Sequence, residues 1–360
     1  MSASSEHRAE KTEMTGQLQG LNQLRFLAAL LVFTQHSLSC CHLDEWIDVA
    51  GFRIGRIGTA LFFLLGGFLS ASTRRKPLSW IKERLIALFP SYWVVTILGF
   101  ILAAVTATKT FDGWQVLSQL AGMGYFTHGD HIVNVATWFI SPLLLLYAAV
   151  VVARLISVKM MTPLLIAGMI AEALSIEPEF SSVRCHAVTF FMAFFVASAG
   201  LQFRNMAALL MTLTMITLSV FQPEFRYGAI ASAMLFVAFQ VEQEVRLCNR
   251  FSKFAYEWFL VHGLCLAIVS HLTPSPPLII VGGAVASIIS ALLLQKFVRW
   301  GKSIRIVNSD ERPSDSSRSS AKRNAPKADT GLKESRSDSE RPARVLTNQN
   351  ACNQRASLEV

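Results

Sequence analysis

Apolar residues occur in ten runs of roughly 15 to 22 residues, each close to the length of about 20 residues at which a helix crosses a bilayer. Backbone groups in lipid must be hydrogen-bonded within their own segment, so each run is expected to be a helix. The runs lie near residues 21–40, 57–73, 91–108, 136–156, 162–176, 185–203, 206–221, 226–241, 254–272 and 277–298. This pattern predicts an all-α, polytopic membrane bundle of about ten transmembrane helices. The fifth run is short and contains Glu172, so a re-entrant segment stays an alternative to a span there.

Polar segments precede and follow this predicted membrane domain of residues 21–300. Residues 1–20 carry acidic and basic side chains and are expected to form a cytoplasmic leader. Residues 301–360 consist largely of Ser, Arg, Lys and Asp, with almost nothing to bury, and are expected to be a disordered cytoplasmic tail. Any chemistry is therefore expected from the membrane helices and their loops.

The distribution of charge predicts the orientation of the chain in the membrane. Hydrophobic residues make up 52% of the sequence and charged residues 16%, with a formal net charge of +9. Much of the basic excess lies in alternate short loops and in the tail, which is a topology signal and does not indicate nucleic-acid binding. With ten spans, both termini are predicted to be cytoplasmic.

Two ionisable residues interrupt the first apolar run. Arg25 and His36 stand eleven residues apart, and at about 100° per residue their side chains leave the same face of a helix. Their axial separation is about 16 Å, roughly half the hydrocarbon thickness. Ionisable groups at this depth are costly and usually face a protein interior or a water-filled cavity, so this face is a candidate functional site.

A basic segment follows the second apolar run. Its five cations, within eleven positions, are Arg74, Arg75, Lys76, Lys82 and Arg84. They suit topology determinants and lipid headgroup contacts, and they equally suit a phosphate site. Pro90 predicts a helix break or a first helical position nearby. In the second run itself, Gly66 and Gly67 favour close helix packing over contact with a ligand.

Five segments resemble the acyltransferase-3 family in order and spacing. They are RFLAALLVFTQH at 25–36, FFLLGGFL at 62–69, RLIALFPSYW at 84–93, TWFISPLLLLY at 137–147 and FAYEWFLVHG at 254–263. This family comprises bacterial integral membrane proteins that O-acylate extracytoplasmic carbohydrates. The resemblance implies an inner-membrane enzyme that moves an acetyl group from cytoplasmic acetyl-CoA to exopolysaccharide, O-antigen or a lipo-oligosaccharide, with glycan-assembly proteins as partners.

The resemblance assigns roles to individual residues. Arg25 and His36 match the arginine and histidine regarded as essential in the family, and Arg84 matches the first arginine of its R-x-x-R motif, whose second position is Ala87 here. Tyr256 and His262 match part of a late Y-x-x-Y-L-x-H pattern. The serine that precedes G-F in the family is Gly66 here, and an acidic residue after the T-W motif is replaced by 142-Pro-Leu-143. These departures indicate a divergent branch.

O-acetylation needs a base, a site for the acyl donor and stabilisation of an oxyanion. His36 is the best base, because an ordinary imidazole titrates near pH 6.5 and is largely neutral at neutral pH. Donor phosphates are expected near Arg25 and Arg84, together with Arg74, Arg75 or Lys82. An acyl-enzyme stays an alternative to direct transfer, since four nucleophilic side chains follow His36. These are Ser37, Ser39, Cys40 and Cys41.

Other features of the sequence leave alternatives open. Trp138 either stacks on a sugar ring or belongs to the aromatic belt, and we favour the belt. His262 either lines the cavity of His36 or makes a structural hydrogen bond. The cysteines and histidines of HSLSCCH lack zinc-site spacing, so neither a metal nor a permanently bound cofactor is expected. A transporter or flippase competes with the enzyme, as does a membrane scaffold, although no inverted repeat supports transport.

Overall fold

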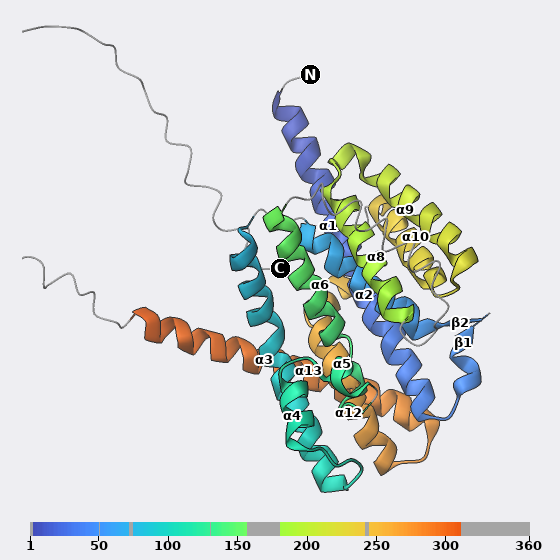
Figure 1. The fold of residues 1–360 in the computed structure, drawn as a ribbon, viewed down its shortest axis with the longest axis vertical. Coiled ribbons are helices and arrows are strands. Elements are labelled where there is room, and N and C mark those ends of the chain that lie inside the picture. Colours follow the sequence, from blue (N-terminus) through green and yellow to red (C-terminus); the bar gives the residue numbers. More distant parts are fainter. Residues whose placement is uncertain are drawn as a thin grey trace, which may run out of the picture. The chain divides into compact units, whose positions relative to one another are not determined.

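The computed structural model describes residues 3–49, 51–71, 75–129, 131–156, 181–241 and 245–310. The predicted helical membrane bundle is confirmed in these ranges, as Figure 1 shows. The long helices are α1 (Ala3–Cys40), α2 (Ile54–Ala71), α3 (Pro77–Thr106), α6 (Ile140–Ile156), α8 (Ser181–Ser198), α9 (Leu201–Phe221), α10 (Phe225–Gln240), α12 (Ala255–Leu272) and α13 (Pro276–Asp310). The predicted span at 162–176 lies outside the described residues.

Six segments of the described chain are long and apolar enough to cross a membrane, and α8 and α10 are shorter apolar helices. The six are Ile54–Ala71, Pro77–Thr106, Val135–Leu155, Gln202–Phe221, Ala255–Leu272 and Pro276–Gly301. Helix α1 is not among them and carries Arg25, Gln35 and His36 in its apolar half. Arg25 and His36, which lower the hydropathy of this helix, are also the residues that made it a candidate site.

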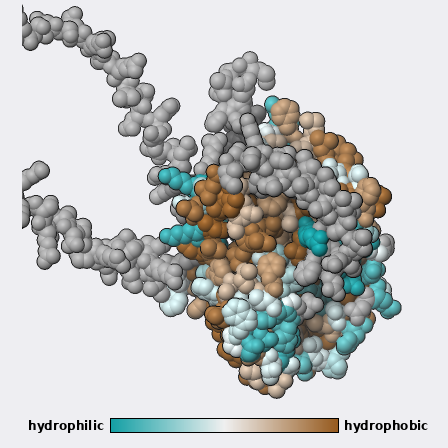
Figure 2. Space-filling model, viewed as in Figure 1, coloured by the Kyte–Doolittle hydropathy of each residue, from teal (hydrophilic) through white to brown (hydrophobic). Residues whose placement is uncertain are grey.

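Short elements connect the long helices. They are η1 (Asp44–Trp46), β1 (Asp48–Val49), β2 (Phe52–Arg53), α4 (Gly113–Leu120), α5 (Gly124–His128), η2 (Val135–Thr137) and α11 (Arg246–Ser252). Strands β1 and β2 are antiparallel, with Asp48 opposite Arg53. Helix α4 begins with a capping box, in which the Asp112 carboxylate accepts from the Gln115 backbone N–H and the Gln115 side chain accepts from that of Asp112. Figure 2 shows hydrophilic residues gathered at the end that carries α4 and α5, beside a largely hydrophobic face.

Three boundaries differ from those predicted. Helix α1 begins at Ala3, so most of the expected leader continues the first helix, and α13 extends to Asp310, beyond the predicted end of the membrane domain. Pro90 neither breaks nor begins a helix: it lies inside α3, and Pro77 occupies the start. Pro90 lacks the N–H that would bond to the Ile86 carbonyl, yet α3 continues to Thr106. Near Pro90, the Tyr256 hydroxyl of α12 donates to the Leu88 carbonyl at 3.0 Å and ties α12 to α3.

Helix α2 lies between α1 and α8 and brings the site's walls together. A Cβ at Gly67 would lie 1.9 Å from the Phe190 carbonyl oxygen, and one at Gly58 would lie 2.6 Å from the Ala28 carbonyl oxygen. Only glycine therefore permits these backbones to approach so closely. The expectation that the glycines of this run serve close packing is confirmed for Gly67, against α8.

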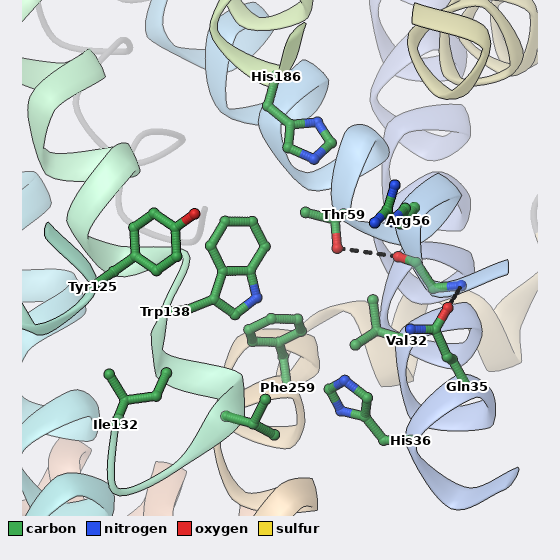
Figure 3. Close-up of a pocket in the computed structure, with 12 residues that line it drawn as sticks. Val32, Gln35, His36, Arg56, Thr59, Tyr125, Ile132, Trp138, His186 and Phe259 are labelled. Carbon is green, nitrogen blue, oxygen red and sulfur yellow. Dashed lines mark hydrogen bonds between the residues drawn. The ribbon is translucent and has the colours of Figure 1, made fainter. Parts of the chain in front are cut away.

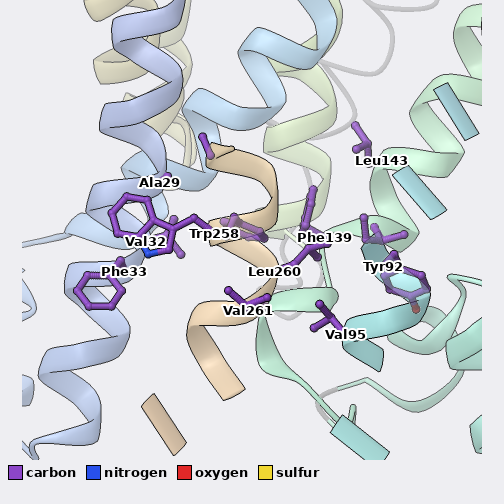
Figure 4. Packing of buried hydrophobic residues seen from close by; sticks show 14 of the residues in the cluster. Ala29, Val32, Phe33, Tyr92, Val95, Phe139, Leu143, Trp258, Leu260 and Val261 are labelled. Atoms are coloured by element: carbon purple, nitrogen blue, oxygen red, sulfur yellow. The ribbon is translucent and has the colours of Figure 1, made fainter. Parts of the chain in front are cut away.

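Helix α12 fills the space between α1 and the pair α3 and α6. Its Trp258 ring lies 5.5 Å from that of Phe33 on α1, and Phe259 lies 4.5 Å from Phe139, edge to face. Figure 4 shows Trp258, Leu260 and Val261 in this position. Packed aromatic pairs of this kind hold helices in a fixed register. The residue that follows Val261, His262, is thereby placed against α1.

Candidate active site

A cavity of about 300 Å³ lies where α1, α2, α5, α8 and α12 meet the segment around η2. Its polar lining comes mainly from Gln35, His36, Arg56, Trp138 and His186. Figure 3 shows the rings of His36, Trp138 and His186 around one space. The volume is at the lower end of the range for small-molecule sites. The cavity therefore admits a small part of a substrate beside His36.

The His36 ring is held by a second histidine from α12. His36 Nδ1 lies 2.7 Å from His262 Nε2, and His262 Nδ1 lies 2.6 Å from the Phe259 carbonyl oxygen. His262 is 1% exposed and does not line the cavity. Of the two alternatives for His262, the structure therefore shows the hydrogen bond between helices, and the partner is His36 itself.

This chain of contacts fixes the tautomers of a neutral histidine pair. A carbonyl oxygen can only accept, so His262 Nδ1 carries a proton and donates to Phe259. His262 Nε2 must then accept, which makes His36 Nδ1 the donor. His36 Nε2 is left with its lone pair, in a ring that lines the cavity. An imidazole in this state can accept a proton from a bound hydroxyl.

Gln35 lies beside His36 and presents its amide to the same cavity. The Gly55 backbone N–H donates to Gln35 Oε1 at 2.8 Å, which ties the oxygen end of the amide to the start of α2. Gln35 Nε2 is hydrogen-bonded to no residue in the described part of the chain. The amide therefore offers its N–H groups to whatever occupies the cavity.

A cluster of cations surrounds the other end of the predicted face of α1. Arg84 on α3 and the Tyr147 hydroxyl on α6 lie within electrostatic range of Arg25, and Arg154 on α6 lies within range of Arg84. Arg84 and Arg154 both lie over the Trp80 ring, at 5.9 and 5.0 Å from its centroid. Neither Arg25 nor Arg84 has an ion pair or a hydrogen bond with another described residue. Guanidinium groups without a carboxylate partner suit phosphate.

A family model described as an acyltransferase domain matches residues 18–296. The chain belongs to the acyltransferase-3 family. No curated protein and no solved structure gave a match. The protein is thus a membrane acyltransferase. The region that matches the family model contains both Arg25 and His36.

The remaining predicted site residues of this acyltransferase are three donor-site cations, Arg74, Arg75 and Lys82, and the cavity candidate Tyr256. Arg74 lies outside the described residues. Arg75 forms an ion pair with Glu83, and Lys82 is exposed. The Tyr256 hydroxyl donates to Leu88 and does not line the cavity. Arg154 was not predicted as a donor-site residue. It brings a second guanidinium close to Arg84, whereas the second arginine of the family's R-x-x-R motif is replaced by Ala87 in this chain.

Trp138 lines the cavity, the position expected of a residue that stacks on a sugar ring. It follows directly on η2, whose cap at Asn134 turns the chain inward: the Asn134 side chain accepts from Ala136 N and donates to the Leu260 carbonyl oxygen at 2.8 Å. This anchoring to α12 accompanies the position of Trp138 at the cavity. Hydropathy alone cannot distinguish this position from the aromatic belt.

None of the four nucleophilic residues after His36 lines this cavity. Ser37 is buried and donates to the Thr34 carbonyl oxygen, Cys40 lines a different cavity, and the Cys41 thiol faces the Pro276 carbonyl oxygen. No group of three metal-ligating side chains occurs in the part of the chain that the structure describes. The acyltransferase therefore has His36 as the evident reactive group of its cavity.

Two cavity residues of this acyltransferase were not singled out from sequence. His186, on α8, and Arg56, on α2, stand 130 residues apart in the chain. Arg56 lies directly before the second apolar run, and His186 lies within the sixth. A buried histidine in a predicted membrane helix was the signal that could have drawn attention to His186.

Proposed function

We propose that this acyltransferase moves an acetyl group from cytoplasmic acetyl-CoA to a hydroxyl of an extracytoplasmic or lipid-linked carbohydrate. The observation that carries the proposal is the lone pair of His36 Nε2, fixed toward the cavity by His262, three helical turns from the unpaired guanidinium of Arg25. A base and a phosphate-binding group on one face suit an acyl donor that carries phosphates at one end and its thioester at the other.

The donor's phosphates bind the cluster of Arg25 and Arg84, with Arg154 beside them. Its thioester arm follows the face of α1 toward His36, a distance of about 16 Å along the helix axis. Positive loops at the same end of the bundle support a cytoplasmic position for this cluster, and hence cytoplasmic termini in a bacterial inner membrane. A reporter fused after residue 300 tests this orientation, which requires the reporter to be active only in the cytoplasm.

Transfer is direct in this proposal. His36 Nε2 takes the proton of the acceptor hydroxyl as its oxygen attacks the thioester carbonyl, and CoA leaves as the tetrahedral intermediate collapses. The Gln35 amide N–H groups, next to His36, donate to the oxyanion. Thr59 lines the cavity, but its hydroxyl donates to the Gly55 carbonyl oxygen at 3.0 Å, so it is not set up as a nucleophile.

Membranes that contain the protein, incubated with acetyl-CoA radiolabelled in the acetyl group, test the function. We expect label in the polysaccharide, lipid-linked sugar or lipo-oligosaccharide fraction, and none with His36→Ala at equal protein level. Export of an unmodified glycan without label would favour the transporter. Rapid quench before acceptor is added should find no acetyl group on the protein, and a covalent acetyl adduct would overturn direct transfer.

A further inference from the structure

His186 is a buried histidine whose hydrogen-bonding groups face the cavity. The residue is 6% exposed and lines the cavity from α8. Its ring stacks on Phe63 at 5.0 Å between centroids and 14° between planes, which leaves the ring edge with its two nitrogens available. No described residue forms a hydrogen bond with these nitrogens. A buried polar group of this kind normally has a partner, so the partner is expected in the cavity.

The same wall carries further donors that form no hydrogen bond with a described residue. Trp138 Nε1 is hydrogen-bonded to no described residue, and its indole lies 6.4 Å from His186 and 5.5 Å from Tyr125. Arg56 uses Nη1 for both Glu224 oxygens, which leaves its Nη2 and Nε groups without a described partner. Figure 3 shows Trp138, His186 and Arg56 around the space above His36. A ligand rich in oxygen atoms satisfies several N–H donors at once.

The charge of this wall limits the ligand further. Among the described residues that line the cavity, Arg56 is the only charged one, and both its contacts to Glu224 are 2.7 Å long. The ion pair leaves the wall without net charge. A ligand carboxylate would lose part of its hydration there with no unpaired cation to balance it. A neutral ring with hydroxyl groups does not meet this penalty.

We propose that His186 binds a hydroxyl of the acceptor and that this wall is a subsite for a neutral sugar ring, stacked on Trp138. The inference rests on the proposed acyl transfer and extends it from a carbohydrate in general to an uncharged unit of it. His186 is a binding residue for the acceptor: it holds the ring so that a neighbouring hydroxyl meets His36. It takes no part in donor binding, because the cations of the donor cluster lie at the other end of α1.

The test uses the full-length protein in nanodiscs, acetyl-CoA, and a panel of methyl hexopyranosides as acceptors, with methyl glucuronoside as the charged counterpart. His186→Phe keeps the stacking on Phe63 and removes the hydrogen bonds, whereas His186→Gln keeps a donor and an acceptor. We expect His186→Phe to raise the KM for the hexoside about 3- to 10-fold, the order of one lost neutral hydrogen bond. His186→Gln restores most of this loss, and the KM for acetyl-CoA stays unchanged in both.

Thr189→Val, one turn further along α8, is the matched control, because the Thr189 hydroxyl donates only to the Cys185 carbonyl oxygen. Wild-type kinetics for His186→Phe, or an equal loss in His186→Gln, would overturn the role of His186. Equal use of the glucuronoside would overturn the neutral subsite, as would binding of acetyl-CoA without transfer to any hexoside. Wild-type protein that neither binds acetyl-CoA nor releases CoA would contradict the proposed function itself, so the two failures are distinct.

Discussion

The contact between His36 and His262 predicts the effect of removing the second histidine. In His262→Phe, the phenyl ring keeps the edge-on contacts that His262 makes with Phe33 and Phe259, at 6.3 and 5.6 Å between centroids. The variant is therefore expected to fold. It removes the acceptor for His36 Nδ1–H, so that the His36 ring is neither oriented nor held in the tautomer that exposes Nε2.

To present Nε2 to the substrate in this variant, the His36 ring must keep its Nδ1–H buried without an acceptor. The size of the effect therefore follows from the cost of an unsatisfied buried donor. That cost is about 1–3 kcal/mol, and at 1.36 kcal/mol for each factor of ten it corresponds to about a 5- to 150-fold lower rate. The loss should appear in kcat at saturating acetyl-CoA and acceptor, since His262 lines no part of the cavity. In the wild type, kcat falls as the pH is lowered, because protonation of His36 removes the lone pair that accepts the substrate proton.

The assay compares wild type, His262→Phe, a matched control, His36→Ala and the double variant at equal amounts in nanodiscs, with CoA release and acetyl transfer both recorded. Cys265→Ala is the matched control on the next turn of α12, because its thiol faces Ser290 and not the cavity. Any residual rate of CoA release in a His36→Ala background should not fall further with His262→Phe, since it acts through His36. A wild-type kcat in His262→Phe, or additive losses in the double variant, would refute the reasoning.

Two further predictions concern the donor end and the packing of α2. Arg25→Gln and Arg84→Gln should each raise the KM for acetyl-CoA while the KM for the acceptor stays constant. The effect should be smaller with acetyl-CoA that lacks its 3′-phosphate. Equal changes in both KM values would contradict a donor site. Gly67→Ala should destabilise the detergent-purified protein by about 3 kcal/mol or more, measured by thermal unfolding, because its Cβ would meet the Phe190 backbone, whereas Gly113→Ala, with no atom within 4 Å of the added Cβ, should not.

The apolar pattern predicted the helices well because each span is determined by its own residues. The common face of Arg25 and His36 depends only on helical geometry, and it could be predicted for the same reason. The partner of His36 could not, because His262 is 226 residues away and its position depends on how α12 packs against α1. No local sequence pattern predicts a contact between residues so far apart in the chain.

Predictions were weakest where tertiary contacts override local preference. Pro90 is an ordinary helix breaker in sequence, yet α3 continues through it beside α12, whose Tyr256 hydroxyl contacts the Leu88 carbonyl. Tryptophan is a residue type typical of the membrane interface, yet Trp138 lines the cavity next to the Asn134 anchor. His186 carries no motif, and its proposed role follows only from the cavity that α8 forms with α1, α2, α5 and α12. Functional positions in this fold are thus set by long-range packing.

The arrangement of the two ends on α1 also bears on how acyl transfer is controlled. The arginine that faces the donor cluster and the histidine that faces the cavity belong to one uninterrupted helix, so the rise of about 1.5 Å per residue fixes their separation. Sites built on helices hold reacting groups more precisely than sites on loops. In the proposed reaction, the donor phosphates can therefore remain at Arg25 while only the acyl end of the donor reaches His36. Transfer then requires that one donor molecule spans both ends of this rigid helix face.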